Sequence, residues 1–236
     1  MKKQILSLSL LLFFGIGLCA QPKVVSEPRV IAKTSEPLTR PAWSPDGTKL
    51  LFTSSESGEL WEVSACGANL RKASGDADQL RAAVGKNSLL QLMINEPLGV
   101  ASKVEMLKSL SGRIIYNPAL SPQGDKIVFQ ASRQKGFFVC DANEQADAST
   151  LRHFEEGGRA VWTPDGKYIV VMVETNDGHV VTKGELVAFE VATGNKSVVF
   201  SSDKYIAFSP AVSPDGKKLA FEDYATGAIY IMDIQQ

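Results

Sequence analysis

The sequence predicts an all-β protein built from repeated four-stranded units, and three observations carry this prediction. One phrase recurs four times, starting at Pro41, Pro118, Ala160 and Pro210. Each copy contains a turn of the Ser-Pro-Asp-Gly kind between two apolar segments, and each is followed by a further strand-like segment. Radially repeated four-stranded sheets form a β-propeller. We therefore expect a β-propeller of about five four-stranded blades, closed by an N-terminal strand.

The phrase itself predicts two antiparallel strands joined by a tight turn. Its first copy reads Pro-Ala-Trp-Ser-Pro-Asp-Gly-Thr-Lys-Leu-Leu-Phe over 41–52. Ser, Pro, Asp and Gly in this order fit a type I turn, because Pro presets its own φ, Asp bonds nearby amides and Gly accepts a left-handed conformation. We therefore interpret Asp46, Asp165 and Asp215 as turn residues rather than catalytic acids.

Further strands complete each unit. A third strand is expected at 59–63, 136–140, 185–191 and 228–233, and a short outer strand at 69–72, 149–153 and 196–200. The aromatic residues that recur at equivalent positions are expected in the core between blades: Trp43, Trp61, Trp162, Phe52, Phe129 and Phe221.

The spacing of the phrases predicts an additional blade. The turn Ser or Thr occurs at 44, 121, 163 and 213, so the gaps are 77, 42 and 50 residues. Propeller repeats span about 40–45 residues, so the first gap holds two units, the second with a degenerate phrase at 81–92. The blades are expected near 41–75, 79–112, 113–154, 155–202 and 203–236. The gap of 50 reflects a long hairpin tip at 175–184, either a tolerated insertion or a contact finger.

The last blade lacks an outer strand after 228–233. The alternating segment 29–33 has no partner of its own, so we expect it to pair with residues 229–233 and to close the ring.

Residues 1–20 resemble a secretory signal peptide. Lys2 and Lys3 precede an apolar run over 5–18, and cleavage after Ala20 would leave 21–236 as a single domain. This predicts a periplasmic or secreted protein. The alternative is a lipoprotein anchored at Cys19, but the preceding Leu18 is larger than such signals prefer.

Composition excludes several function classes. With 25 Lys and Arg against 26 Asp and Glu, bulk charge attracts neither nucleic acid nor an anionic membrane. No other apolar run is long enough for a transmembrane segment. We also expect the protein to be a monomer. Cys66 and Cys140 fall on different expected blades, so we expect two unpaired, buried thiols.

No catalytic constellation is apparent. The sequence lacks a Gly-x-Ser-x-Gly elbow, a His and Cys cluster with metal spacing, and a phosphate-binding glycine loop. His153 is expected on an outer strand and His179 in the hairpin tip. Glu155 and Glu156 could form a carboxylate pair, but adjacent residues of a strand point to opposite faces. We expect no enzyme activity, no cofactor and no metal.

The four phrases resemble the WD40-like repeat of the TolB family, and the resemblance covers roughly residues 36–236. It implies a periplasmic propeller that binds other proteins. TolB itself has six blades, an additional N-terminal α/β domain and a propeller that binds the lipoprotein Pal. Here five blades are expected, and about twenty residues separate the expected signal from the first repeat. Pal binding is therefore not carried over.

We expect an exported TolB-like propeller that acts as a protein- or peptide-binding or scaffolding module of the bacterial cell envelope. The alternatives are a small-molecule or glycan sensor and, least favoured, a propeller hydrolase with two carboxylates.

A binding site is expected where the inner strands begin, on the face opposite the turns. Aligning these strands places Arg40, Arg81, Asn117, Arg159 and Ser209 in one column, flanked by Tyr116 and Phe208. Three arginines would make this channel mouth positive and suited to a peptide C-terminus or an acidic loop. The competing interpretation pairs the arginines with acids such as Glu36 and Asp78.

Overall fold

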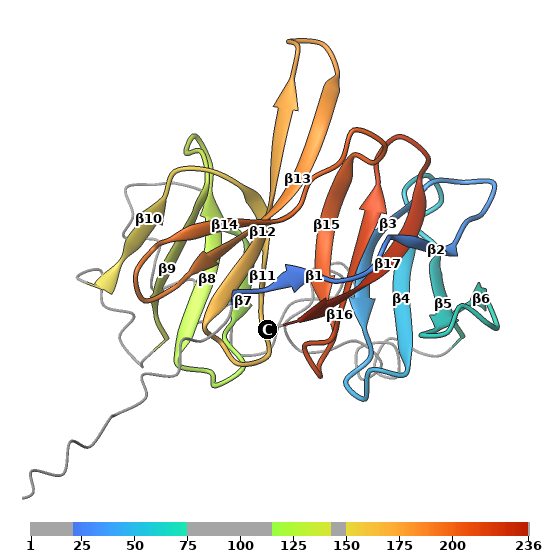
Figure 1. Ribbon diagram of the computed structural model, residues 1–236, viewed down its shortest axis with the longest axis horizontal. Helices are drawn as coiled ribbons and strands as arrows, with labels where there is room; N and C mark the ends of the chain where they lie inside the picture. Colours follow the sequence, from blue (N-terminus) through green and yellow to red (C-terminus); the bar gives the residue numbers. More distant parts are fainter. Residues whose placement is uncertain (1–20, 75–114, 143–149, 236) are drawn as a thin grey trace, which may run out of the picture.

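The computed structural model describes residues 21–74, 115–142 and 150–235, and in these residues the chain is all-β (Figure 1). Seventeen strands form four sheets. Three sheets have four consecutive strands each, and we call each sheet a blade. They comprise β3 (Leu38–Trp43), β4 (Lys49–Ser54), β5 (Leu60–Ser64) and β6 (Arg71–Lys72); β7 (Ile115–Leu120), β8 (Lys126–Ala131), β9 (Phe137–Asp141) and β10 (Arg152–Phe154); β11 (Gly158–Trp162), β12 (Tyr168–Asn176), β13 (Val181–Glu190) and β14 (Lys196–Phe200).

The fourth blade combines the two ends of the chain. It contains β15 (Ala207–Val212), β16 (Lys218–Asp223) and β17 (Ala228–Gln235), and its outer edge is formed by β1 (Lys23–Val24) and β2 (Arg29–Ala32). Val30 pairs with Tyr230, and Val24 pairs with Ile234. The expected antiparallel pairing of the segment around Val30 with the last strand is therefore present.

Most expected strands match the observed ones to within a few residues. The long hairpin expected at 175–184 is present, and β12 and β13 project well beyond the neighbouring strands (Figure 1). The fifth blade expected at 79–112, together with its Arg81, lies outside the described residues.

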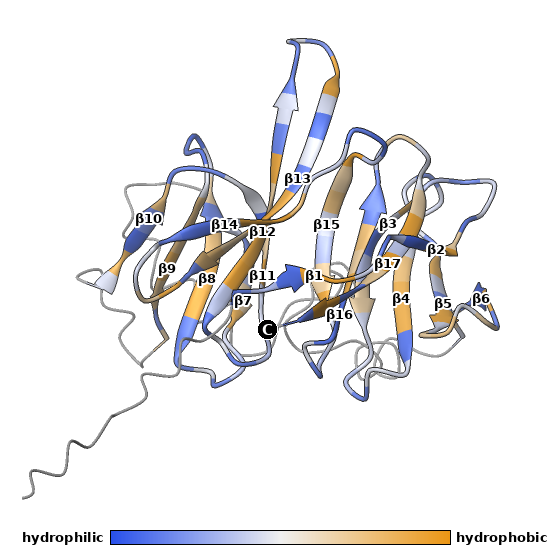
Figure 2. Cartoon of the chain, viewed as in Figure 1, coloured by the Kyte–Doolittle hydropathy of each residue, from blue (hydrophilic) through white to orange (hydrophobic). Residues whose placement is uncertain are grey.

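Three pairs of blades are packed side by side, including the first and the last along the chain. β11 contacts β7 and β8, β15 contacts β11, β12 and β13, and β3 contacts β15, β16 and β17. Apolar residues gather along the strands, whereas most of the turns are polar (Figure 2). Trp43, Trp162, Phe52, Phe129 and Phe221 are all buried, as expected for a core between blades. Trp61 is only partly buried and packs against the edge of such a cluster.

The recurring turns have the expected chemistry. The amide of Gly47 donates to the carbonyl of Ser44 over 2.9 Å, and Gly47 has a left-handed φ of 69°. Asp46 Oδ1 accepts from the Ser44 hydroxyl at 2.6 Å and from the Thr48 amide at 3.0 Å. Asp165 and Asp215 accept equivalent bonds. The three aspartates are therefore turn residues.

The second copy of the turn is built differently. Gln123 replaces the aspartate, and the carboxylate of Asp125, two residues later, accepts from the Ser121 hydroxyl at 2.7 Å. The same serine thus keeps an acidic partner supplied from another position.

Cys66 and Cys140 are both free, but the expectation that both are buried is wrong for one of them. Cys140 is buried, whereas Cys66 is exposed. The reason is that Cys66 lies in the turn after β5, where the Gly67 amide donates to the Ser64 carbonyl over 2.8 Å. Contact with the Ser64 hydroxyl lowers the pKa of the Cys66 thiol.

In the described part of the chain we find no helix with the length and apolar character needed to cross a bilayer.

Candidate functional site

Every inner strand of the described blades contains a β-bulge at the same place. In β3, Thr39 pairs with Thr53 and Ala42 with Leu51, so Arg40 and the following proline face the single residue Phe52. A bulge inserts one extra residue and redirects the side chains around it. The three other bulges consist of Asn117 and Pro118, Arg159 and Ala160, and Ser209 and Pro210.

The first residue of each bulge has a left-handed backbone. The φ angles are 56° for Arg40, 52° for Asn117, 50° for Arg159 and 46° for Ser209. For a residue other than glycine this conformation costs about 1–2 kcal/mol, so the surrounding packing must hold it. Proline follows in three of the four bulges, where its missing N–H is tolerated because the inner strand is an edge of its sheet. The described members of the column found by sequence alignment are therefore strained bulge residues.

Three of these bulges contribute a residue to the lining of one cavity, which we call the mouth cavity. Its volume is about 300 Å³, and it is lined by Arg40, Tyr116, Asn117, Gln130, Gly158, Arg159 and Met172. The structure thus brings together four of the seven residues expected at the mouth.

The remaining expected residues lie beside the cavity or outside the described chain. Arg159 Nη1 donates to the Ser209 hydroxyl over 2.6 Å, so Ser209 contacts the cavity lining. Phe208 is buried and stacks on the exposed Tyr224 with ring centroids 5.0 Å apart. Arg81 is not among the described residues.

The two arginines of the mouth cavity influence each other. Arg40 and Arg159 are both half-buried. Burial lowers the pKa of Arg40, the charge of Arg159 lowers it further, and the carboxylate of Glu222 opposes both effects. Like charges in a partly desolvated cavity repel, and an anion placed between them would relieve this repulsion.

Of the two acids proposed as alternative partners of the arginines, Glu36 has partners of its own. The carboxylate of Glu36 accepts hydrogen bonds from the hydroxyl groups of Ser54 and, at 2.8 Å, Ser57. These bonds lower the pKa of Glu36. Asp78 lies outside the described residues.

Sequence reasoning missed the second-strand residues of the site, namely Gln130, Met172 and Glu222. Each directly follows the last residue of its phrase, in a place where the first copy has Thr53. The sequence did contain a signal for these positions, namely a polar residue directly after an otherwise apolar second-strand segment. It is present in three of the four copies, as Thr53, Gln130 and Glu222.

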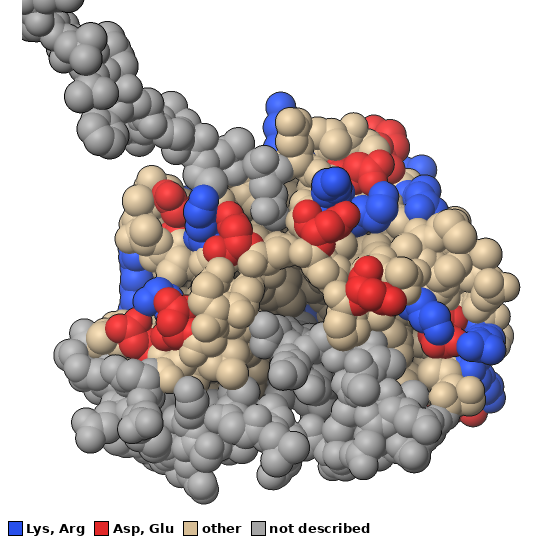
Figure 3. Space-filling view, turned by 90° about the horizontal axis from the view of Figure 1, so that it is seen from below, with Lys and Arg blue, Asp and Glu red and all other residues tan. Residues whose placement is uncertain are grey.

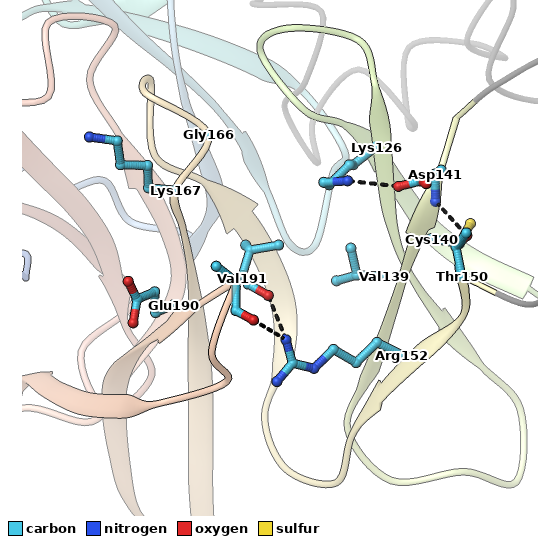
Figure 4. A pocket seen from close by; sticks show the side chains of 11 residues that line it. Lys126, Val139, Cys140, Asp141, Thr150, Arg152, Gly166, Lys167, Glu190 and Val191 are labelled. Atoms are coloured by element: carbon cyan, nitrogen blue, oxygen red, sulfur yellow. Dashed lines mark hydrogen bonds and ion pairs between the residues drawn. The ribbon is translucent and has the colours of Figure 1, made fainter. Parts of the chain in front are cut away.

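A second cavity of about 560 Å³ lies between β8–β10 and the next blade, which contributes the turn before β12, the end of β13 and the residues directly after β13 (Figure 4). The guanidinium of Arg152 points at the β13–β14 connection and donates to the carbonyls of Val191, Ala192 and Thr193 over 2.7–2.9 Å. Lys126 pairs with Asp141 at 2.7 Å. Arg152 thus holds two blades together, whereas the Lys126–Asp141 pair joins β8 and β9 within one blade.

The thiol in this second cavity is a poor nucleophile. Burial raises the pKa of Cys140 to about 11, so the thiol stays protonated near neutral pH. The carboxylate pair weighed from the sequence is also not a strand pair, because Glu155 and Glu156 lie in the connection between β10 and β11. Glu156 forms an ion pair with Lys196.

The face that carries the turns differs from the mouth. Seen from that side, acidic and basic side chains are interspersed around a central hollow (Figure 3). The β12–β13 hairpin projects from the opposite side, where the inner strands begin (Figure 1). The mouth cavity and the hairpin therefore share one face.

No family model matches the chain, and no curated protein matches it either. Solved structures do. A protein assigned as TolB from Agrobacterium tumefaciens is 20% identical, with 86% of this chain and 60% of that chain covered and a TM-score of 0.40. TolB from Acinetobacter baumannii is 15% identical, with 88% and 46% covered and a TM-score of 0.36. The chain thus spans less than two thirds of either TolB structure.

The calcium-binding protein regucalcin from Agrobacterium tumefaciens superimposes more fully. It is 12% identical, the match covers 88% of this chain and 94% of that chain, and the TM-score is 0.54. At such identity the likeness concerns the fold alone. The chain is an all-β propeller with four blades in its described residues, and TolB is among its structural neighbours.

Proposed function

We propose that this protein is an exported, non-catalytic propeller that binds a peptide or protein segment through an acidic group held in the mouth cavity. The observation that carries this proposal is the placement of Arg40 and Arg159 in the lining of one cavity. Arginine binds carboxylates through two parallel hydrogen bonds. The half-burial of both guanidinium groups strengthens such a contact, since water competes less for it.

The size of the cavity favours a small acidic group over a whole small-molecule ligand. A volume of about 300 Å³ is at the lower limit of ligand pockets, which span about 300–1,000 Å³. This space suits a terminal carboxylate or one acidic side chain. The rest of the partner would then lie on the surrounding face.

That surrounding face offers exposed aromatic and apolar groups. Tyr116 is 40% exposed and Tyr224 is 56% exposed. Tyrosine is enriched among the residues that dominate binding energy at protein interfaces. The hairpin adds the exposed Val180 on the same side. An acidic group in the cavity and apolar contacts around it together suit a peptide or a protein loop.

A binding role is also favoured over catalysis by what the acidic residues do. The carboxylates of Asp46, Asp165 and Asp215 accept hydrogen bonds within their own turns. The carboxylate of Glu156 is paired with Lys196. Their hydrogen bonds and ion pair give these carboxylates a structural role, so no catalytic role is needed to account for them.

We further propose that the ring has a fifth blade within 79–112 and that β2 closes it. The gap of 77 residues between Ser44 and Ser121 supports the additional blade. The pairing of β2 with β17 and the contact of β3 with β15 support closure, since both join the two ends of the chain. The apolar run after Lys2 and Lys3 supports export to the periplasm or beyond.

The test uses two heptapeptide libraries that lack Asp and Glu and differ only at the C-terminus, one with free carboxylates and one amidated. Each is passed over the immobilised protein, and the retained peptides are quantified by mass spectrometry. The wild-type protein should retain the carboxylate library at least about tenfold better, because a hydrogen bond to a charged group contributes about 1.5–3 kcal/mol. The double variant Arg40→Gln with Arg159→Gln should lose this preference.

Arg71→Gln is the matched control. Arg71 is an exposed arginine of the outer strand β6, paired with Glu62 at 2.5 Å, and its loss should leave retention unchanged. Equal retention of the two libraries by the wild-type protein, or full retention by the double variant, would contradict the proposal.

A further inference from the structure

Side chains of two second strands cross a blade border and bind the bulge of the next blade. Gln130 Oε1, on β8, accepts from the amide of Arg159 at 3.2 Å and from Asn117 Nδ2 at 2.8 Å. Glu222 Oε2, on β16, accepts from the amide of Arg40 at 2.7 Å and from the Thr39 hydroxyl at 2.5 Å. In both cases the bonded amide belongs to a left-handed arginine of the mouth cavity.

The two acceptors occupy equivalent positions in their blades. Gln130 pairs with Tyr116 and Glu222 pairs with Phe208, in each case with the residue directly before the bulge. Met172 pairs in the same way with Gly158. The three positions therefore carry a neutral acceptor, a charged acceptor and a side chain without an oxygen. Because the three side chains occupy the same position in their blades, comparing them separates the effect of accepting a hydrogen bond from the effect of carrying a charge.

The bonds matter because the bulge residues are strained. An arginine keeps a left-handed backbone only if the surrounding structure stabilises that conformation. Hydrogen bonds to its backbone amide do so when they cannot form in another conformation. Glu222 is 7% exposed, so its bonds to Arg40 and Thr39 face little competition from water. The direction in which each arginine leaves the backbone follows from the φ angle that these bonds hold.

We propose that Gln130 and Glu222 are positioning residues that fix the two arginine-bearing bulges from the preceding blade, and that the charge of Glu222 sets the mouth cavity to prefer a monoanion over a dianion. The second half of this proposal rests on the proposed function. Among the described groups of the site, the two guanidinium charges of the cavity lining are offset by one carboxylate, that of Glu222, whose charge acts on Arg40. A bound carboxylate balances this excess, whereas a phosphoryl group of charge near −2 leaves a negative charge beside Glu222.

The first measurement needs no ligand and compares thermal unfolding of variants at position 222. Glu222→Gln keeps an oxygen acceptor and removes the charge, so its melting temperature should stay close to that of the wild type. Glu222→Met copies the residue at position 172 and leaves the Arg40 amide without this acceptor. Its melting temperature should fall by roughly 3–10 °C. Met172→Leu is the control at the equivalent position and should change it little, since no acceptor is lost.

The second measurement uses one N-acetylated peptide that is otherwise uncharged, in two forms. The monoanion has a free C-terminal carboxylate, and the dianion is amidated and carries one phosphoserine. The wild-type protein should prefer the monoanion. Glu222→Gln should raise affinity for the dianion by roughly tenfold relative to the monoanion.

The outcomes separate the parts of the proposal. Equal melting temperatures for Glu222→Gln and Glu222→Met overturn the positioning role, whatever binds. The expected melting pattern with an unchanged preference between the two peptides overturns the selectivity role. If neither peptide binds the wild-type protein or Glu222→Gln, the proposed function and its selectivity fail together, while the melting pattern still decides the positioning role.

Discussion

The indole Nε1 of Trp162 donates a hydrogen bond of 3.1 Å to the carbonyl of Ala119, across the border between two blades. Trp43 makes the equivalent bond of 3.0 Å to the carbonyl of Ala211. In both pairs the indole of one inner strand reaches the inner strand of a neighbouring blade. The other two described copies have Leu120 and Val212 in place of the tryptophan, so this link is made only where the phrase contains an indole.

Replacing Trp162 with phenylalanine should destabilise the protein by about 1–3 kcal/mol, because the buried carbonyl of Ala119 loses its partner. The free energy of unfolding in urea measures this. Trp61→Phe is the control, since Trp61 lies at the edge of its cluster and is only partly buried. A loss for Trp61→Phe as large as that for Trp162→Phe would argue against a role for the indole bond.

The turns and hairpins could be predicted from the sequence because their chemistry is local. Ser44 and Asp46 bond each other across two residues, and four repetitions make the signal strong. The pairing of β2 with β17 is distant in sequence, but a missing outer strand and an unpartnered strand pointed to it. Burial of Cys66 was the error, because this residue lies in the turn between two strands of its blade, where its side chain is exposed.

The candidate site could be predicted only in part. The column through Arg40, Asn117 and Arg159 followed from alignment, but their left-handed backbone did not, because arginine rarely adopts it and the three residues share no side-chain chemistry. Gln130 and Glu222 were missed for another reason. Their hydrogen bonds join different blades, and nothing local in the sequence states which amide an acceptor at the end of a strand will meet.

Acid should weaken the first turn of the repeat. Hydrogen bonds from Ser44 and from the amide and hydroxyl of Thr48 lower the pKa of Asp46 from 3.8 to about 2. Because the folded pKa lies below the unfolded one, this carboxylate contributes stability above about pH 4 that is lost as the pH falls from about 4 to 2. Melting temperatures measured between pH 5 and pH 2 should therefore fall less steeply for Asp46→Asn than for the wild type.

The second copy supplies the control for this experiment. Gln123 occupies the same turn position and has no charge, so Gln123→Asn should leave the pH dependence of melting unchanged. If Asp46→Asn and the wild type lose stability in parallel on acidification, the Asp46 carboxylate contributes nothing in this pH range.

Gly184 is required where the base of the projecting hairpin passes β15. A Cβ at Gly184 would lie 2.6 Å from the carbonyl oxygen and 2.9 Å from the amide nitrogen of Ala207, and neither backbone atom can move away easily. Gly184→Ala should therefore cost about 1–3 kcal/mol as an overpacked site. Gly158→Ala is the comparison, because its Cβ would meet the end of the flexible Gln130 side chain at 3.1 Å. Equal melting temperatures for the two variants would contradict this reasoning.

The N-terminal strands should stabilise the last blade. Ile31 is 6% exposed and packs in one cluster with Trp43 and Phe52, whereas Val30 is 52% exposed on the other face of β2. A chain that begins at Glu36 would lack these contacts and would leave β17 as an open edge. Its melting temperature should fall sharply, and light scattering should show association through the open edge.

A pair of point variants separates packing from the mere presence of the strand. Ile31→Ala should cost about 2–5 kcal/mol, as expected for truncating a buried isoleucine. Val30→Ala removes a similar side chain from the exposed face and should cost far less. Because both variants keep the backbone pairing of β2 with β17, a large difference between them shows that β2 is packed into the core. Unchanged melting of Ile31→Ala and of the shortened chain would mean that the last blade is stable without β2, and the proposed closure of the ring by this strand would be wrong.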